Sequence, residues 1–183
     1  MNIAKHEFTE SVLSYSPTVY DAWKKGVRDF LPKDYHIPDE VVNQPNFHFG
    51  EHYVWVHYLK LGWQGFIWYA IGEWEPNNKK YDLGRRKINE LFNDNDLEEI
   101  RELRKGILSG EPDLFFYKDD GSTLFIEVKK DTDTPSDPQL TCLAQIKSIL
   151  GVEVGITHLV PEGKEYVPKT YELDLIEFKW RVI

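Results

Sequence analysis

Residues 110–129 read GEPDLFFYKDDGSTLFIEVK, and this stretch decides the fold. Two apolar segments, Asp113–Tyr117 and Thr123–Lys129, flank the polar sequence KDDGS, which is typical of a β-hairpin turn. Successive side chains of a strand point to opposite faces, so Glu127 and Lys129 share one face of the second strand. The sequence therefore predicts a hairpin that carries an acid and a base on the same face.

The first strand of this hairpin begins with a second acid, Asp113. The turn can bring its carboxylate beside that of Glu127, and two neighbouring carboxylates suit Mg²⁺ or Mn²⁺. Lys129 would then lie close enough to orient a water molecule and to offset charge that develops on a phosphate. These residue types match phosphodiester hydrolysis. The alternative is a plain hairpin on which Glu127 forms an exposed ion pair with Lys129 or Lys130.

The sequence on either side of the hairpin predicts further helices and strands. These predicted elements are a helix over Glu51–Leu61, a strand over Phe66–Ile71, helices over Arg85–Phe92, Leu97–Lys105 and Pro135–Leu150, a strand over Val152–Thr157, and one or two strands within Tyr166–Val182. This order is typical of an α/β domain in which helices flank a central mixed sheet.

Residues 1–47 lack this regular pattern. A helix is predicted over Thr18–Phe30, after which Pro32, Pro38 and Pro45 divide the chain into turns. The sequence therefore predicts two parts, an N-terminal appendage over residues 1–47 that packs on the core and a domain over residues 48–183.

Three short motifs follow one another along this domain: GEPD at 110–113, EVK at 127–129 and DTPSDPQ at 133–139. Together with a preceding helix that begins with Glu51 and ends in LGW, they resemble the PD-(D/E)XK nuclease superfamily. Within it, the similarity is to the virus-type replication-repair nuclease (VRR-NUC) domain and covers roughly residues 50–160. The resemblance implies a restriction-endonuclease-like core. It also implies a metal-dependent DNA endonuclease acting on branched, flapped or junction DNA.

The resemblance implies roles for individual residues as well. It makes Asp113 and Glu127 ligands of Mg²⁺ or Mn²⁺, and the backbone carbonyl of Val128 a further ligand. Lys129 would be the catalytic lysine.

Two more residues join this site by resemblance, Gln139 from the start of the following helix and Glu51 from the first helix, where it could also bind the metal. Each has a simpler alternative. Ser136 and Gln139 are spaced as a capping box, and the two roles of Gln139 could coexist. Glu51 could merely be an acid that the helix dipole favours near a helix N-terminus.

Candidate nucleic-acid contacts come from a locally basic segment. The net charge of −9, from 31 acidic and 22 basic residues, argues against a broad phosphate-binding surface. A solvated surface is the alternative for the basic segment. Most of the nearby aromatic residues are predicted to be core, and Trp74 is the candidate for an exposed base contact. The basic candidates are Lys79, Lys80, Arg85, Arg86, Lys87 and Lys130.

The rest of the composition excludes several classes. One cysteine, Cys142, allows neither an internal disulfide framework nor a cysteine-rich zinc site. The longest apolar stretch, residues 65–71, is too short to span a bilayer, and no signal peptide is recognisable. We therefore expect a soluble, cytoplasmic protein. The sequence HFGEH at 48–52 matches a zinc-metalloprotease pattern, but Gly50 argues against the continuous helix that this motif needs.

Four functions remain open at this point. The leading one is a Mg²⁺- or Mn²⁺-dependent DNA endonuclease, expected to form a homodimer because cutting two strands of a junction asks for two sites related by two-fold symmetry. The others are a catalytically silent nuclease fold that binds nucleic acid or protein, an RNA nuclease, and a zinc protease.

Overall fold

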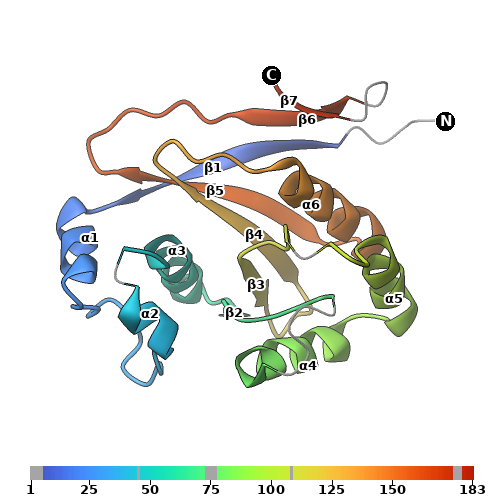
Figure 1. Ribbon diagram of the computed structural model, residues 1–183, viewed down its shortest axis with the longest axis horizontal. Coiled ribbons are helices and arrows are strands. Elements are labelled where there is room, and N and C mark those ends of the chain that lie inside the picture. Colours follow the sequence, from blue (N-terminus) through green and yellow to red (C-terminus); the bar gives the residue numbers. More distant parts are fainter. Residues whose placement is uncertain (1–5, 45, 73–77, 108, 175–178) are drawn as a thin grey trace.

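The seven-stranded mixed sheet and its flanking helices confirm the predicted α/β class, and they are consistent with a restriction-endonuclease-like core (Figure 1). The computed structural model describes residues 6–44, 46–72, 78–107, 109–174 and 179–183. The strands lie in the order β2-β3-β4-β5-β1-β6-β7. Their bounds are β1 Glu7–Tyr15, β2 Gln64–Phe66, β3 Leu114–Tyr117, β4 Thr123–Lys130, β5 Glu153–Pro161, β6 Thr170–Asp174 and β7 Lys179–Val182.

The predicted hairpin forms one side of this sheet. β3 and β4 pair in antiparallel fashion, and the Lys118 amide donates to the Ser122 carbonyl across the turn. β4 then runs parallel to β5, which requires a crossover. Helix α6 (Asp137–Leu150) makes that crossover. Only a few residues therefore separate α6 from β4, the strand that carries Glu127 and Lys129.

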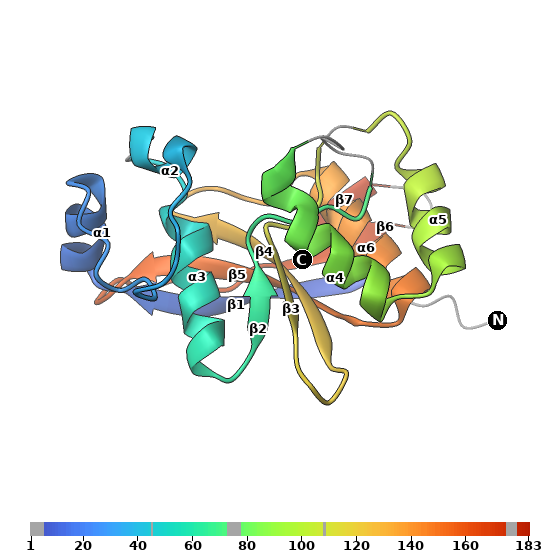
Figure 2. The ribbon, with the colours of Figure 1, turned by 90° about the horizontal axis from the view of Figure 1, so that it is seen from below.

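Helices cover both faces of the sheet (Figure 2). On one face, Ile126 and Val128 of β4 pack with α3 (Phe49–Lys60) and with the N-terminal segment. On the other face, Phe125 packs with residues of α4, α5 and α6. The strand alternation predicted from the sequence is therefore confirmed. The remaining helix bounds are α1 Pro17–Lys24, α2 Asp39–Asn43, α4 Asp82–Leu91 and α5 Asp94–Leu103, with a short 3₁₀ turn, η1, over Lys79–Tyr81.

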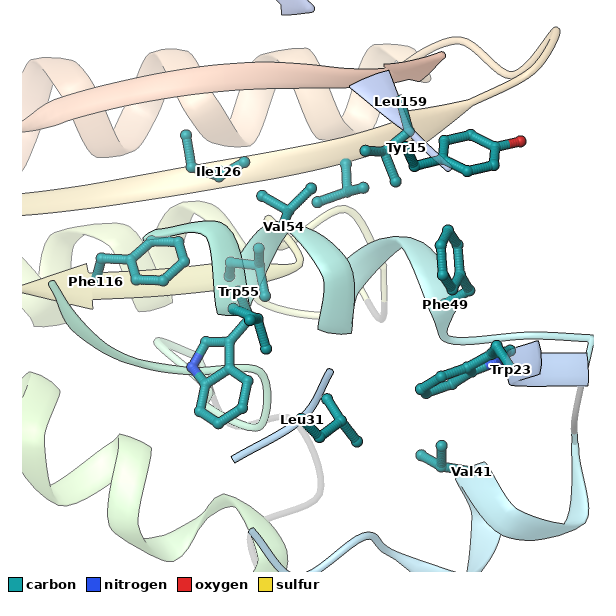
Figure 3. Packing of buried hydrophobic residues seen from close by; sticks show 13 residues of the cluster. Tyr15, Trp23, Leu31, Val41, Phe49, Val54, Trp55, Phe116, Ile126 and Leu159 are labelled. Atoms are coloured by element: carbon teal, nitrogen blue, oxygen red, sulfur yellow. The ribbon is translucent and has the colours of Figure 1, made fainter. Parts of the chain in front are cut away.

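Helix α3 is buried between the sheet and the N-terminal segment (Figure 3). Val54 lies toward the strands, whereas Phe49 contacts the ring of Trp23 from α1. Val41 of α2 and Leu31 belong to the same cluster. Burial on two sides explains why this helix has apolar residues around most of its circumference, as expected for a helix without a solvent face. It also fixes the position of the α3 N-terminus relative to β4.

The N-terminal residues differ from the prediction. β1 is an internal strand that pairs in parallel with β5 and in antiparallel fashion with β6, so this part of the appendage belongs to the sheet. Residues 17–43 do pack on the core, through α3. The predicted helix over Thr18–Phe30 is shorter, because Gly26 adopts a φ of 83° and the chain turns there.

The predicted strand over Phe66–Ile71 is also wrong over most of its length. Only Gln64–Phe66 is a strand, and the following residues are held in another way. The amides of Ile71 and Gly72 donate to the Glu111 carboxylate instead of to a neighbouring strand. The C-terminal tail, predicted to hold one or two strands within Tyr166–Val182, contains two, β6 and β7.

Candidate active site

Asp113 and Glu127 lie opposite each other where β3 begins. Leu114 pairs with Ile126, so the antiparallel register places the preceding Asp113 across from Glu127 and on the same face. One Asp113 carboxylate oxygen, Oδ2, accepts the amide hydrogen of Val128 at 2.7 Å. The hairpin therefore brings together the two carboxylates that its sequence predicts.

The Glu127 side chain is fully buried, and only one of its two carboxylate oxygens accepts hydrogen bonds from described residues. Its Oε1 accepts from Lys129 Nζ at 2.7 Å and from Gln139 Nε2 at 2.5 Å. Its Oε2 is buried and has no donor among the described residues, and the Asp113 carboxyl lies within hydrogen-bonding reach of the Glu127 carboxyl. A buried acceptor without a donor is costly, so Oε2 is the atom in this cluster that a ligand could satisfy.

The pKa values of both acids are raised. Burial, and next the Glu127 and Glu51 charges, raise the pKa of Asp113 well above its usual value. Burial likewise raises the pKa of Glu127 to about 7, although the Lys129 ammonium opposes this shift. Two acids that resist ionisation together are poised to bind a cation, because a positive charge between them would remove the penalty.

Lys129 lies on the same strand face as Glu127, as the sequence predicts, and is buried. Burial alone would lower the pKa of Lys129, but the carboxylates of Glu127, Asp113 and Asp133 outweigh it and the pKa is raised. The Nζ atom lies 3.6 Å from Asp133 Oδ2. Lys129 is therefore a charged ammonium held at the carboxylate pair. This ion pair is buried, which differs from the exposed pair of the plain-hairpin alternative.

Gln139 forms the predicted capping box and also contacts the Glu127 carboxylate. Its Oε1 accepts the Ser136 amide at 2.9 Å, which forms the capping box at the start of α6. Its Nε2 donates to Glu127. The helix cap thus aims one amide group at the carboxylate, and the orientation of Gln139 is set by local structure.

Glu51 lies near Asp113 on α3, the helix that packs on the opposite face of the sheet. It lies in the first turn of α3, lines the same two cavities as Asp113 and contributes to the raised pKa of that residue. Burial raises the pKa of Glu51, but a hydrogen bond from His48 and the local backbone more than reverse this, so the pKa is lowered. Glu51 is therefore an ionised carboxylate beside the Asp113–Glu127 pair.

The candidate donors for a small divalent cation are the Asp113 and Glu127 carboxylates and the Val128 carbonyl. The N–H and C=O groups of one strand residue point to the same side, so the Val128 carbonyl lies on the edge that its amide shares with Asp113. No group of three or more His, Cys, Asp or Glu side chains within the described ranges is arranged to hold a metal. Mg²⁺ is commonly bound by one or two carboxylates together with water and substrate phosphates, and Asp113 with Glu127 matches that pattern.

A groove of about 280 Å³ is lined by Asp113, Val128 and Lys129 of this cluster, with Glu127 buried behind them. Lys129, Lys130 and Asp133 line it together with residues 46–51, which lead into the first turn of α3. Phe47 lines this groove and is 64% exposed. No sequence motif points to Phe47, because only the fold brings residues 46–51 against the end of β4. Asp133 begins the DTPSDPQ motif, but its contact with Lys129 is seen only in the structure.

The basic segment lies away from the carboxylate cluster, and part of its positive charge is paired within α4. Arg85 pairs with Asp82, and Lys87 with Glu90, within α4. Arg86 is exposed on the same helix, and Lys79 is exposed just before it. These four lie outside the groove and the adjoining cavity described below.

Of the other two basic candidates, Lys130 lines the groove, whereas Lys80 contacts Trp68, a residue of the adjoining cavity. Lys80 pairs with Glu40 at 3.1 Å and lies 4.4 Å above the Trp68 ring. Lys130 pairs with Asp131 and lines the groove. Trp74 lies outside the described residues.

The zinc-protease pattern has no matching geometry. Both ring nitrogens of His52 are engaged within the protein, Nδ1 with the His48 carbonyl at 2.7 Å and Nε2 with the Tyr35 hydroxyl at 3.1 Å. Burial lowers the pKa of His52 to about 4, so it is neutral. His48 precedes the helix in a left-handed conformation and does not share a helical face with His52.

The GEPD turn (residues 110–113) contacts both residues 69–72 and the start of α6. Glu111 holds the segment at residues 71 and 72 through two amide bonds, and the Tyr69 hydroxyl donates to the Pro112 carbonyl at 2.5 Å. Gly110 has a φ of 93°, and a Cβ there would lie 2.8 Å from the Pro138 backbone. These contacts position Asp113 against both β4 and the start of α6.

No protein-family model matches this sequence, and no curated protein shows a significant match to it. In the described part of the chain, no helix combines the length and apolar character that crossing a membrane would require.

Proposed function

We propose that this protein is a Mg²⁺- or Mn²⁺-dependent nuclease that hydrolyses phosphodiester bonds, with DNA as the substrate. The observation that carries the proposal is the buried Glu127 carboxylate, which holds Lys129 and Gln139 on one oxygen and leaves the other without a donor beside Asp113. The resemblance to VRR-NUC nucleases supports the same function from the order of the motifs.

The residues of the site divide the chemistry among them. Asp113, Glu127 and the Val128 carbonyl would hold the cation, which would supply Lewis acidity toward the scissile phosphate and the attacking water. Lys129 places an ammonium at the same carboxylates, where it can orient a water molecule and stabilise negative charge on the phosphate. Gln139 fixes the orientation of Glu127. Glu51, ionised and next to Asp113, is positioned to accept a proton or to complete the ligand set.

A cleavage assay with paired variants tests this proposal. Purified protein is incubated with labelled DNA in Mg²⁺, Mn²⁺ or EDTA, and the same reactions are run with Asp113→Asn and Lys129→Ala. Matched controls are Asp29→Asn and Lys60→Ala, which change exposed residues that line neither cavity. We expect metal-dependent cleavage that both site variants lose and both controls keep.

Equal cleavage by the wild type and the site variants would refute the catalytic assignment. Branched, flapped and linear DNA, compared with RNA of the same sequence, identify the preferred substrate, because residues that handle the phosphate do not read its context. Metal binding without cleavage of any of these substrates would favour the silent module. The homodimer expected from two-strand cleavage stays a prediction, which sedimentation at several protein concentrations measures.

A further inference from the structure

A second cavity, of about 230 Å³, adjoins the catalytic groove. His48, Glu51 and Asp113 line both spaces, so the candidate metal ligands Asp113 and Glu51 lie between the groove and the second cavity. Its volume lies just below the range of roughly 300–1,000 Å³ for small-molecule sites, a size that suits one aromatic heterocycle better than a larger ligand.

The walls of this cavity are largely aromatic and apolar. Trp68 and Tyr81 line it with their rings nearly perpendicular, at 86° and a centroid distance of 6.2 Å. Ile67 and Ile107 add aliphatic surface. Gly84 of α4 holds this wall together, because a Cβ there would lie 2.5 Å from the Trp68 carbonyl. Such a surface accepts the flat face of a ring by stacking.

One cation lines the cavity from within the protein. Arg104 is only 6% exposed, its Nη2 donates to the Ser109 carbonyl at 2.6 Å, and its Nε is buried without a partner among the described residues. An incompletely satisfied buried guanidinium is costly and is suited to a ligand that offers acceptor atoms. A phosphate is disfavoured, because the carboxylates of Glu51, Glu111 and Asp113 share the same walls.

From these features we infer that the cavity binds an unpaired nucleobase of the strand being cut, next to the scissile phosphate. The inference rests on the proposed function. A neutral base has a flat π-face that can stack on Trp68 and Tyr81. It also has ring nitrogens that can accept hydrogen bonds from Arg104. A base that enters this cavity is unstacked, so the preferred substrate has a single-stranded or mispaired nucleotide at that position.

Removing single bases from the substrate tests this inference. Single-stranded DNA oligonucleotides carry one abasic position, which is moved stepwise past the cut, and kcat/KM is measured for each. We expect one position adjacent to the cut at which base removal lowers kcat/KM by about 5- to 150-fold, the range for the loss of one stacked base. Pairing that nucleotide in a duplex should lower kcat/KM as well.

Variants connect the effect to the cavity. Tyr81→Ala removes one ring. Ile107→Ser changes a residue that is 47% exposed, so the substitution should affect the free energy of unfolding little. Both should shrink the abasic penalty, measured as the ratio of kcat/KM for the intact substrate to that for the abasic substrate. Leu103→Ser is the matched control, because Leu103 is 51% exposed nearby but does not line the cavity.

The outcomes separate this inference from the proposed function. Cleavage with no position-specific penalty overturns the base pocket and leaves the nuclease standing. In the absence of any cleavage, a DNA oligonucleotide with unpaired 2-aminopurine is titrated in Ca²⁺. A saturable fluorescence change that Tyr81→Ala and Ile107→Ser weaken, but Leu103→Ser does not, supports the pocket without the nuclease. No change, or an equal change in all variants, overturns the pocket.

Discussion

Gln139 connects the start of helix α6 to the Glu127 carboxylate on β4. Its amide oxygen accepts the Ser136 amide hydrogen, and its amide nitrogen donates to Glu127 Oε1 at 2.5 Å. The same side chain therefore caps a helix and orients a candidate metal ligand. A change at this residue should act on stability and on activity by different amounts, which makes the two roles separable.

Replacing Gln139 with alanine should lower activity more than stability. Loss of the capping box and its hydrogen bonds should lower the free energy of unfolding by about 1 kcal/mol. Loss of the bond that orients Glu127 should lower metal affinity or kcat by about 10- to 100-fold, the range for residues that support metal ligands. Urea unfolding and cleavage kinetics measure the two effects.

Gln145→Ala is the control for this variant, because Gln145 lies on the same helix and outside the carboxylate cluster. It should leave kcat and metal affinity unchanged. If Gln139→Ala and Gln145→Ala reduce activity alike, Gln139 acts only through the stability of α6.

Replacing Asp113 with asparagine should stabilise the metal-free protein at alkaline pH. The folded-state pKa values of Asp113 and Glu127 are raised, the latter to about 7. Groups of this kind favour folding below their unfolded pKa, and that contribution is lost as pH rises through the folded value. Asp113→Asn removes one of the two charges, so in EDTA its unfolding free energy should exceed that of wild type by roughly 1–3 kcal/mol at pH 8. The difference should shrink toward pH 5. Thermal unfolding across this range measures it, and a variant that is less stable at every pH would contradict the account.

Mg²⁺ or Mn²⁺ should reverse that order of stability. A ligand that binds only the folded state stabilises it by about 2.7 kcal/mol at one hundred times its dissociation constant. We therefore expect either metal to raise the melting temperature of wild type, and Asp113→Asn to respond little. Calorimetric titration gives the affinity without reference to catalysis. An equal thermal shift in the variant would place the ion elsewhere.

Much of the site follows from local sequence rules. The alternation of β4 places Glu127 and Lys129 on one face, and the hairpin turn places Asp113 opposite them. The spacing of Ser136 and Gln139 predicts the capping box that the structure contains. In each case the controlling distance is a few residues along the chain, where strand and helix periodicities determine geometry.

The parts that the sequence does not predict depend on contacts between distant residues. β1 joins the sheet through pairing with β5, almost 150 residues later, and its own alternation is interrupted by the exposed Ser11 and Val12. The base-sized cavity requires α5, the segment before α4 and the GEPD turn to meet. Nothing in the sequence distinguishes Phe47 from other loop residues. It lines the groove because α3 packs against β4. Helix and strand propensities carry no information about contacts between residues that are far apart in the chain.

A buried polar cluster beside the site should contribute to stability in a pH-dependent manner. The Tyr166 hydroxyl donates to Glu10 Oε2 at 2.6 Å and lies 3.0 Å from His158 Nδ1. Burial raises the pKa of Glu10, but hydrogen bonds from Tyr166, Lys169 and Tyr171 outweigh it and the pKa is lowered. The stabilising contribution of Glu10 is therefore present above its unfolded pKa and is lost as pH falls through the folded value.

Tyr166→Phe should lower the unfolding free energy by about 1–3 kcal/mol at pH 7, since a hydrogen bond to a buried carboxylate is lost. The loss should be smaller at pH 4. Tyr53→Phe is the control, because the Tyr53 hydroxyl makes an exposed bond of 3.3 Å. Chemical denaturation at both pH values measures the difference, and a penalty independent of pH would mean that Glu10 is not its source.

Gly110 and Gly121 allow backbone conformation to be separated from packing at the GEPD turn. Both have a positive φ, 93° and 87°, so alanine at either position should cost about 1–2 kcal/mol from backbone strain. A Cβ at Gly121 meets open space, whereas one at Gly110 would lie 2.8 Å from the Pro138 backbone. Gly110→Ala should therefore cost about 1–3 kcal/mol more than Gly121→Ala. It should also weaken metal binding, because the turn holding Asp113 must move away from α6. Denaturation and metal titration of the two variants check both statements. Equal effects would mean that the contact between the turn and α6 is not what positions Asp113.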